Sequence, residues 1–347
     1  MNRKRADIIA VLQTGGEMTE GYRGEKVITL ALAVTATLLT GCSRWPGFAA
    51  KTEDYGLASG RVQVRVVDDQ GQPVEGATVF VSSTSWNAYE GLTDENGVYS
   101  CTMKNIYPPI GGSVRKQGYY KTQGDFWTGD FGVLPTERLE ITLKRIINPV
   151  PLEKREVRLL FPVLGEPVGF DFAAGDWVDP YGKGKLADVF ITGTFERDDK
   201  QSTFSYVAML SAVSRHDGFV PFQVVRRSGD MPARSALQAP QLAQESGYKR
   251  KISAHLKRLG GRRGWDDSYY SGVDYYFRVR TVMDQNQEVE SANVGWFFRG
   301  IRMTRNDKFD PANPATRLRI TMCYYWNPDP TSRSLEPKEI ADRQGVE

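Results

Sequence analysis

Apolar and polar residues alternate most clearly between Gly60 and Tyr120. Val62, Val64 and Val66 are separated by polar or charged residues, and this period of two predicts a strand with one apolar face. Turn-forming residues follow at 68–73, and the same kind of break recurs at Asn96-Gly97, a strong hairpin signal. Short apolar stretches at 77–81 and 98–101 complete the pattern. The stretch therefore predicts a small domain of strands joined by tight turns.

The pattern resumes at Leu139, Ile141 and Leu143, which predict the last strand of a first domain over 60–146. The prolines of the Asn148-Pro149-Val150-Pro151 segment favour an extended connector, so a second domain is expected over 147–330. Turn residues follow each of its main strand candidates, as an antiparallel sandwich requires. The expected fold class is all-β, with two β-sandwich domains in series. The strands of the second domain are expected at 157–161, 187–194, 203–210, 219–225, 275–282, 295–303 and 317–326.

One helix is predicted at 246–259, because Ile252, Leu256 and Leu259 recur at helical spacing and Gly260-Gly261 follows as a cap. The polar stretch 331–347 is expected to be a flexible tail. Three aromatic triplets fall within predicted strands and are expected to pack in the core. They are Tyr275-Tyr276-Phe277, Trp296-Phe297-Phe298 and Tyr324-Tyr325-Trp326.

The first domain carries a characteristic spacing of glycine, valine, proline and aspartate residues: Gly60, Val62, Val64, Asp68, Gly71, Pro73, Val74, Gly76, Ala77, Val79, Thr93, Asp94, Gly97 and Tyr99, with Gly118-Tyr119 later. In this spacing it resembles the carboxypeptidase regulatory-like domain, a transthyretin-like or Ig-like β-sandwich. That resemblance implies a module that is commonly non-catalytic, with carbohydrate binders among related folds. The stretches at 144–151, at 169–172 with 175–178, and at 324–328 with 335–336 also resemble uncharacterised lipoproteins and imply no activity.

The amino-terminal region predicts export. Arg23 and Lys26 precede a thirteen-residue apolar run at 27–39, which suits a secretory signal and falls short of the roughly 20 residues of a membrane-spanning helix. The run ends in Leu39-Thr40-Gly41-Cys42, which resembles a bacterial lipobox and implies lipid attachment at Cys42; a plain signal peptide is the alternative.

We therefore expect a signal peptide at 1–41 and a lipidated tether at 42–59. Ser43 after the anchor favours the outer membrane by the same resemblance. Met18 would begin a signal of ordinary length.

Composition narrows the function classes. The formal net charge of +3 is too small to argue for nucleic acid, and two histidines make His-based metal or general-base chemistry a weak expectation. No cofactor is expected. Cys101 and Cys323 lie in different domains, and the sequence leaves open whether they pair or stay as buried thiols.

Two acidic features are candidates for catalytic or metal sites. Asp171, Asp176, Asp179 and Asp188 lie in a glycine-rich region, where they either bind Ca²⁺ or satisfy backbone donors in turns. The spacing is not that of an EF-hand loop, and the turn role is favoured. His216-Asp217-Gly218 is interpreted as a turn before a strand, because no nucleophile motif accompanies it.

Two further surfaces are candidates for binding. Trp86, Tyr89 and Trp127 fall in or near loops, where flat rings suit sugar faces or else pack against the core. Basic residues gathered at 249–251, 257–258 and 262–263 either meet an anionic envelope polymer or form ordinary solvated surface. The sequence thus predicts a non-catalytic, lipid-anchored envelope protein that binds a glycan or assembles with envelope proteins, with an envelope hydrolase using Asp171 or Asp176 as the alternative.

Overall fold

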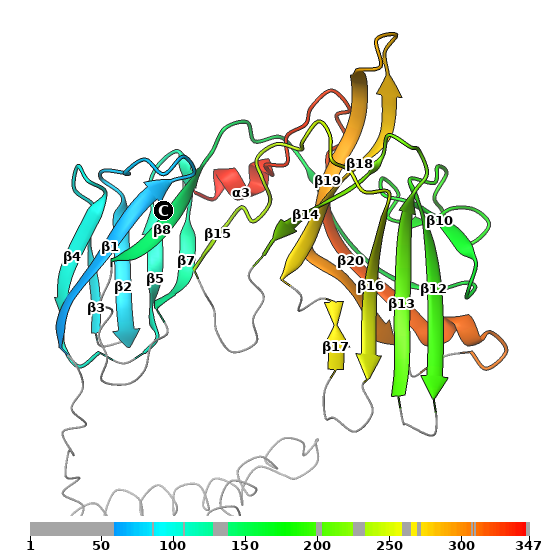
Figure 1. Cartoon of the computed structure of the whole chain (residues 1–347), viewed down its shortest axis with the longest axis horizontal. Helices are drawn as coiled ribbons and strands as arrows, with labels where there is room; N and C mark the ends of the chain where they lie inside the picture. The colour runs from blue at the N-terminus through cyan, green and yellow to red at the C-terminus, as the bar shows by residue number, and fades with distance from the viewer. Residues whose placement is uncertain are drawn as a thin grey trace, which may run out of the picture. The chain divides into compact units, whose positions relative to one another are not determined.

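The structure is a computed structural model that describes residues 59–84, 87–106, 108–127, 138–198, 203–224, 233–258, 265–268, 272–306, 308 and 310–344. These residues are built almost entirely from strands, which confirms the all-β class (Figure 1). Residues Gly56–Glu347 form one compact unit. No helix among the described residues is long and apolar enough to cross a membrane.

Two sheets form the first lobe, which we define as residues 60–145, and enclose its core. Val62, Val64 and Val66 are buried on one face of β1, as their period of two predicts. Asp68 ends this strand, and its Oδ1 accepts hydrogen bonds from the backbone N–H groups of Gln70 and Gln72. One sheet has the order β4 (Val98–Met103), β1 (Gly60–Asp68), β8 (Leu139–Arg145) and β6 (Tyr119–Tyr120); the other has β15 (Arg234–Ser235), β7 (Thr122–Trp127), β5 (Ile110–Arg115), β2 (Thr78–Thr84) and β3 (Asn87–Leu92).

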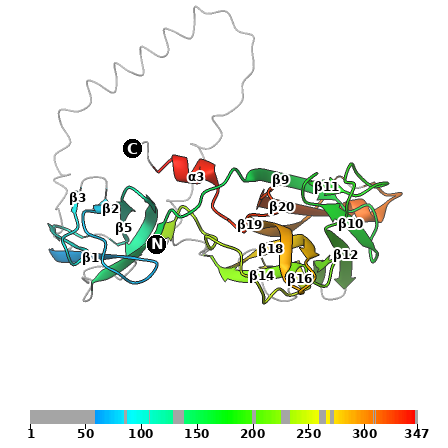
Figure 2. The same ribbon diagram turned by 90° about the horizontal axis from the view of Figure 1, so that it is seen from above.

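The second lobe, defined as residues 153–326, is a sandwich of two antiparallel sheets (Figure 2). Its core is aromatic: Phe172 stacks on Phe277 with ring centroids 4.1 Å apart, and the Tyr324 ring meets Phe172 edge-on. The sheets are β11 (Asp176–Trp177), β10 (Pro167–Asp171), β12 (Val189–Asp198), β13 (Thr203–Ala212), β16 (Lys251–Arg258) and β17 (Trp265–Asp267), facing β14 (Gly218–Gln223), β18 (Val273–Met283), β19 (Val289–Arg305), β20 (Leu318–Trp326) and β9 (Glu153–Leu160). A 3-10 turn, η3, spans Pro314–Arg317.

The three aromatic triplets lie in β18, β19 and β20, as predicted. Seven of their nine rings are buried, and the other two, Tyr275 and Phe298, are half-buried at the margins of the packed clusters. The prediction that these triplets pack in the core is therefore confirmed.

The helix predicted at 246–259 is wrong, because residues 251–258 form strand β16. Ile252 and Leu256 are four apart, a spacing that one face of a strand shares with one face of a helix. Ala254 lies between them, and these even-numbered residues face the core while the odd-numbered ones alternate outward. Pairing with β13 supplies the backbone hydrogen bonds that decide the conformation.

The flexible tail expected at 331–347 is also wrong over the C-terminal segment, which we define as residues 331–344. Ser334, Leu335 and Glu336 are fully buried, and α3 (Lys338–Asp342) follows them. Leu335 packs in a third cluster that includes Trp296 and Tyr325 on the outer face of the second-lobe sheet. The polar composition of the segment therefore conceals one apolar anchor and a set of buried hydrogen bonds.

Residues 233–243, which we call the strap, leave the second lobe and pack against the first. Its strand β15 pairs antiparallel with β7, so residues beyond position 230 complete a sheet that begins near position 78 (Figure 1). Leu237 and Ala239 of the strap share the third cluster with Tyr120 of the first lobe and Leu335 of the C-terminal segment. The two lobes are thus joined by a shared core as well as by the connector.

Candidate functional site

The predicted ligand-binding aromatics do not form one platform. Trp86 lies outside the described residues, as does Cys42, the residue predicted to be lipidated. Tyr89 pairs with the core residue Val81, and Trp127 pairs with Ile110, so both rings face the core of the first lobe and are half-buried. Strands β5 and β2 separate them, a span of about 14 Å at the usual strand spacing. A single sugar ring cannot rest on both.

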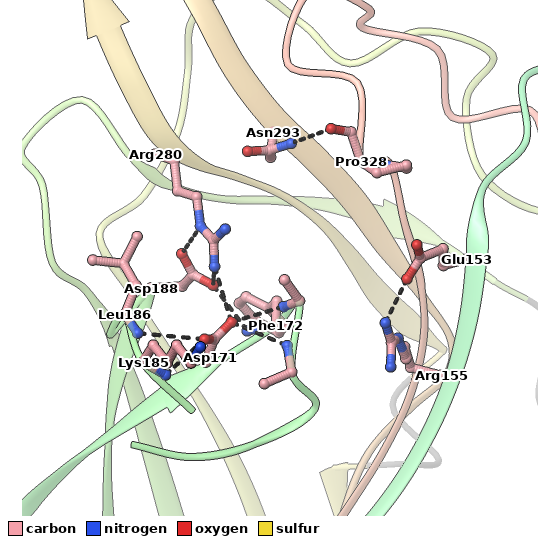
Figure 3. Close-up of polar contacts among 12 residues, drawn as sticks. Glu153, Arg155, Asp171, Phe172, Lys185, Leu186, Asp188, Arg280, Asn293 and Pro328 are labelled. Carbon is pink, nitrogen blue, oxygen red and sulfur yellow. Dashed lines mark hydrogen bonds and ion pairs between the residues drawn. The ribbon is translucent and has the colours of Figure 1, made fainter. Parts of the chain in front are cut away.

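The acidic region of the second lobe is an ion-pair network (Figure 3). Arg280 donates to Asp188 through Nε at 2.7 Å and to Asp171 through Nη2 at 2.9 Å. Asp171 also accepts backbone N–H groups from Ala173, Ala174, Lys185 and Leu186. Its carboxylate oxygens are therefore directed at backbone donors and one guanidinium, and this set of partners leaves little room for a cation.

The pKa values of these two carboxyl groups shift in opposite directions. Burial acts to raise the pKa of Asp171, but its backbone donors and Arg280 outweigh burial and hold the pKa below its usual range. Burial dominates at Asp188 and raises its pKa, with Arg280 opposing. Because both carboxyls contact the same guanidinium, we interpret them as structural partners of Arg280 that close the loop between β10 and β12.

Asp217 aims Arg280 at the two carboxylates. Arg280 lies in a β-bulge of β18 with φ 58°, a conformation uncommon outside glycine. The carboxylate of Asp217 accepts the backbone N–H groups of Arg280 and Thr281, each at 3.1 Å, and so holds the bulge. The predicted turn before β14 is present, and the carboxylate of Asp217 is engaged in holding the bulge of β18.

Other predicted candidates also have backbone roles. Asp176 accepts the N–H groups of Trp177 and Lys183 at 2.8 and 3.0 Å, as turn aspartates do. Within the described ranges no three His, Cys, Asp or Glu side chains lie close enough to hold a metal ion. Cys101 and Cys323 are both free thiols. The carboxylates of Asp171, Asp176 and Asp217 are therefore all engaged in structural contacts in this region.

The junction between the lobes is held by buried polar groups. Glu336 is fully buried, and its carboxylate accepts the backbone N–H groups of Ile147 and Asn148 in the connector at 3.1 and 2.5 Å. Lys144 donates through Nζ to the carbonyls of Gln238 and Ala239 in the strap. Burial lowers the pKa of Lys144, partly offset by Asp69. These contacts fix the strap and the C-terminal segment against the first lobe.

A basic hollow opens where the strap meets the first lobe, and we call it the junction pocket. It has a volume of about 400 Å³. Its basic residues come from the sheet of the first lobe, from the strap and from the end of α3. No Asp or Glu is among the residues that line it. The lining residues are Arg115, Lys116, Tyr119, Lys121, Gln123, Arg234, Ser235, Ala236, Gln238, Arg343 and Gln344.

The chemistry of the junction pocket suits an anionic ligand that also carries hydroxyl groups. Five cations around one hollow create a positive potential, and the hollow shape concentrates it. Tyr119, Ser235 and three glutamines offer neutral donors and acceptors beside them. The Ser235 hydroxyl oxygen is buried without a hydrogen-bond partner in the structure, so a ligand hydroxyl has a group to meet there.

No local pattern in the sequence marks this pocket. Its cations come from positions 115–121, 234 and 343, and the pairing of β15 with β7 brings the distant ones together. The basic residues that the sequence does gather lie in the other lobe. Lys249 and Arg250 precede β16, Lys251, Lys257 and Arg258 belong to it, and positions 262–263 lie outside the described residues.

Comparison with known proteins adds little. No family model and no curated protein matches the chain. Among solved structures, a match titled "Structure of the Streptococcal ancillary pilin" has 12% sequence identity, covers 51% of this chain and 58% of that chain, and has a TM-score of 0.18. The match spans little more than half of the pilin chain, and so low a TM-score supports no argument about function.

Proposed function

We propose that this protein is an exported, lipid-anchored, non-catalytic binding protein of the cell envelope, and that the junction pocket recognises an acidic saccharide. The observation that carries the proposal is the lining of the pocket, where five cations and several neutral hydrogen-bonding groups meet without a carboxylate among them. Cations suit the acid group of such a sugar, and the neutral groups suit its hydroxyls. The proposal keeps the expected carbohydrate ligand and moves it from the aromatic residues to the pocket.

The envelope location rests on the amino-terminal sequence. The apolar run at 27–39 and Leu39-Thr40-Gly41-Cys42 support export and lipidation, with the outer membrane as the destination. The resemblance of the first lobe to the carboxypeptidase regulatory-like domain supports a non-catalytic module. Radiolabelled palmitate incorporated in cells tests the anchor: Cys42→Ala is expected to abolish labelling, and equal labelling of the variant would refute lipidation at this residue.

Ligand binding is tested with the unlipidated full chain, prepared as Cys42→Ser. We expect it to bind polygalacturonate, an acidic polysaccharide, and not dextran, a neutral one. Arg234→Gln with Arg343→Gln is expected to weaken binding about tenfold or more, because hydrogen bonds to charged groups contribute about 1.5–3 kcal/mol each. Binding is also expected to weaken with added salt, which screens charges beyond about 8 Å at physiological ionic strength.

A matched control separates the pocket from bulk charge. Arg61→Gln with Arg138→Gln removes the same charge elsewhere on the first lobe, because both residues are exposed and neither lines the junction pocket. This control is expected to bind like the parent. Equal weakening of both double variants would indicate nonspecific attraction and would remove the pocket from the proposal.

A further inference from the structure

Among the described residues, the strap and the C-terminal segment cover only part of the outer face of the second-lobe sheet β14-β18-β19-β20-β9. Tyr276, Trp296 and Tyr325 lie beneath the strap and the C-terminal segment in the third cluster. The strand pairing places a second set of outward residues on β9, on β20 and on the last part of β19. None of these residues belongs to the third cluster, and we call this part of the face the bare half because the strap and the C-terminal segment, as far as the structure describes them, do not pack on it.

The register of the strands sets basic side chains around two threonines on the bare half. Thr321 of β20 pairs with Arg158 of β9 on one side and with Arg302 of β19 on the other. Two residues along, Arg319 pairs with Thr304. Neighbouring strands lie about 4.8 Å apart, so the backbones of Arg158 and Arg302 are separated by about 10 Å with Thr321 between them. Long guanidinium side chains on both sides can reach a group that rests above Thr321.

These residues border one shallow hollow of about 330 Å³, which we call the arginine hollow. Four arginines line it, and Glu156 is the single acid among the residues that do so. Glu156 accepts from Arg158 at 2.7 Å, and Arg319 donates to the Asn306 side chain at 3.3 Å. Arg158 lowers the pKa of Glu156, so this acid is charged at neutral pH. The lining residues are Glu156, Arg158, Arg299, Gly300, Arg302, Thr304, Arg319, Thr321 and Cys323.

Among the residues that line the hollow, four guanidinium groups against one carboxylate leave an excess of positive charge. Guanidinium is the side chain that binds phosphate in a two-pronged geometry, and threonine hydroxyls donate to the remaining oxygens. A phosphate monoester carries a charge of about −1.5 to −2 and three strong acceptor oxygens at neutral pH. It matches the excess charge more closely than a single carboxylate does.

We propose that the arginine hollow binds a phosphoryl group, borne either by a soluble phosphate monoester or by a lipid headgroup. The arginine hollow shares no lining residue with the junction pocket and does not depend on Cys42. Loss of phosphoryl binding and loss of saccharide binding are therefore separate experimental outcomes. The sheet holds Arg158, Arg302 and Arg319 on three adjacent strands, which fixes the backbone positions of the three arginines before a ligand arrives. Arg302 and Arg319 are the residues on which the site most depends.

The test uses the unlipidated Cys42→Ser full chain with two probes. Inorganic phosphate is titrated by calorimetry, and vesicles of phosphatidylcholine with phosphatidic acid are compared with pure phosphatidylcholine vesicles by flotation. Arg302→Gln with Arg319→Gln is expected to weaken binding to the responding probe about tenfold or more, because two charge-assisted contacts are lost. Binding of free phosphate identifies a soluble source, and binding of the acidic vesicles alone identifies a lipid source.

Two control variants sharpen the test. Arg234→Gln with Arg343→Gln in the junction pocket is expected to leave phosphoryl binding unchanged. Arg302→Lys keeps the charge and loses the planar fork, so it is expected to weaken binding measurably if the geometry matters. The proposal is overturned if neither probe binds, if the Arg302→Gln and Arg319→Gln variant binds like the parent, or if the junction-pocket variant loses as much. Circular dichroism of each variant establishes that it is folded.

Discussion

Replacing Arg280 by methionine tests whether Asp171 and Asp188 are structural partners and not a reactive pair. The side chain of Asp188 is fully buried, that of Asp171 is 7% exposed, and both contact Arg280. Removing one member of a buried ion pair costs about 3–5 kcal/mol, because the other charge is left without compensation. Protonation sets an upper limit on the loss of stability, because a carboxyl group left without its partner can be neutralised, and at pH 7 this costs about 4 kcal/mol for a carboxyl of ordinary pKa. We therefore expect Arg280→Met to lower the free energy of unfolding by about 3–5 kcal/mol.

Urea unfolding followed by tryptophan fluorescence measures this loss. Arg65→Met is the matched control, because it removes the same group from an exposed ion pair with Glu140, where the expected cost is about 0–1 kcal/mol. Adding Asp188→Asn to Arg280→Met is expected to recover part of the stability, since one uncompensated charge is removed. If Arg280→Met costs no more than Arg65→Met, or if Asp188→Asn recovers nothing, the network does not have the role assigned to it.

Three further predictions concern the rest of the fold. Arg145 holds the pKa of Asp68 below its usual range, so the unfolded chain binds more protons than the folded one. The stability from this contact is therefore present above about pH 4 and is lost as the pH falls further. Asp68→Asn is expected to reduce the dependence of stability on pH in this acidic range, as measured by urea titrations, and an unchanged dependence would contradict the assignment. Glu336→Ala removes the buried carboxylate that accepts from the N–H groups of Ile147 and Asn148, so we expect a loss of about 1.5–3 kcal/mol from hydrogen bonds to a charged group and faster proteolytic cleavage at the connector, with exposed Glu75→Ala as control. An uncut connector would count against this role. Gly295→Ala would set a Cβ into overlap with the Tyr325 carbonyl and the Phe277 ring on the neighbouring strands, and we expect it to lower stability by about 1–3 kcal/mol in thermal unfolding, whereas a neutral effect would show that these strands can shift to admit a methyl group.

The sequence predicts most where the chemistry is local. The alternation of Val62, Val64 and Val66 is sufficient to place β1 and its buried face, since a strand has a strict period of two. Turn residues act in the same way: the carboxylate of Asp94 accepts the N–H groups of Asn96 and Val98, both within four positions. Such features depend on neighbours in the chain and can be recognised without knowledge of the fold.

The errors arise where distant contacts decide the outcome. At Ile252 and Leu256 the spacing fits a helix and a strand equally, and pairing with β13 selects the strand. The burial of Leu335 depends on Trp296 and Tyr325, and that of Glu336 on a connector nearly 190 positions earlier. The junction pocket likewise exists only because β15 pairs with β7, which no local pattern of residues reveals.

The most direct test of the account is calorimetric titration of the unlipidated chain with an acidic sugar oligomer and with its methyl ester. The two ligands share size, ring chemistry and hydroxyl groups, and differ in the charges that the five cations of the junction pocket would meet. We expect oligogalacturonate to bind, with an affinity that falls as salt is added, and its methyl ester to bind far more weakly. Equal binding of the two forms, or no binding of the acid form at low salt, would contradict the central claim.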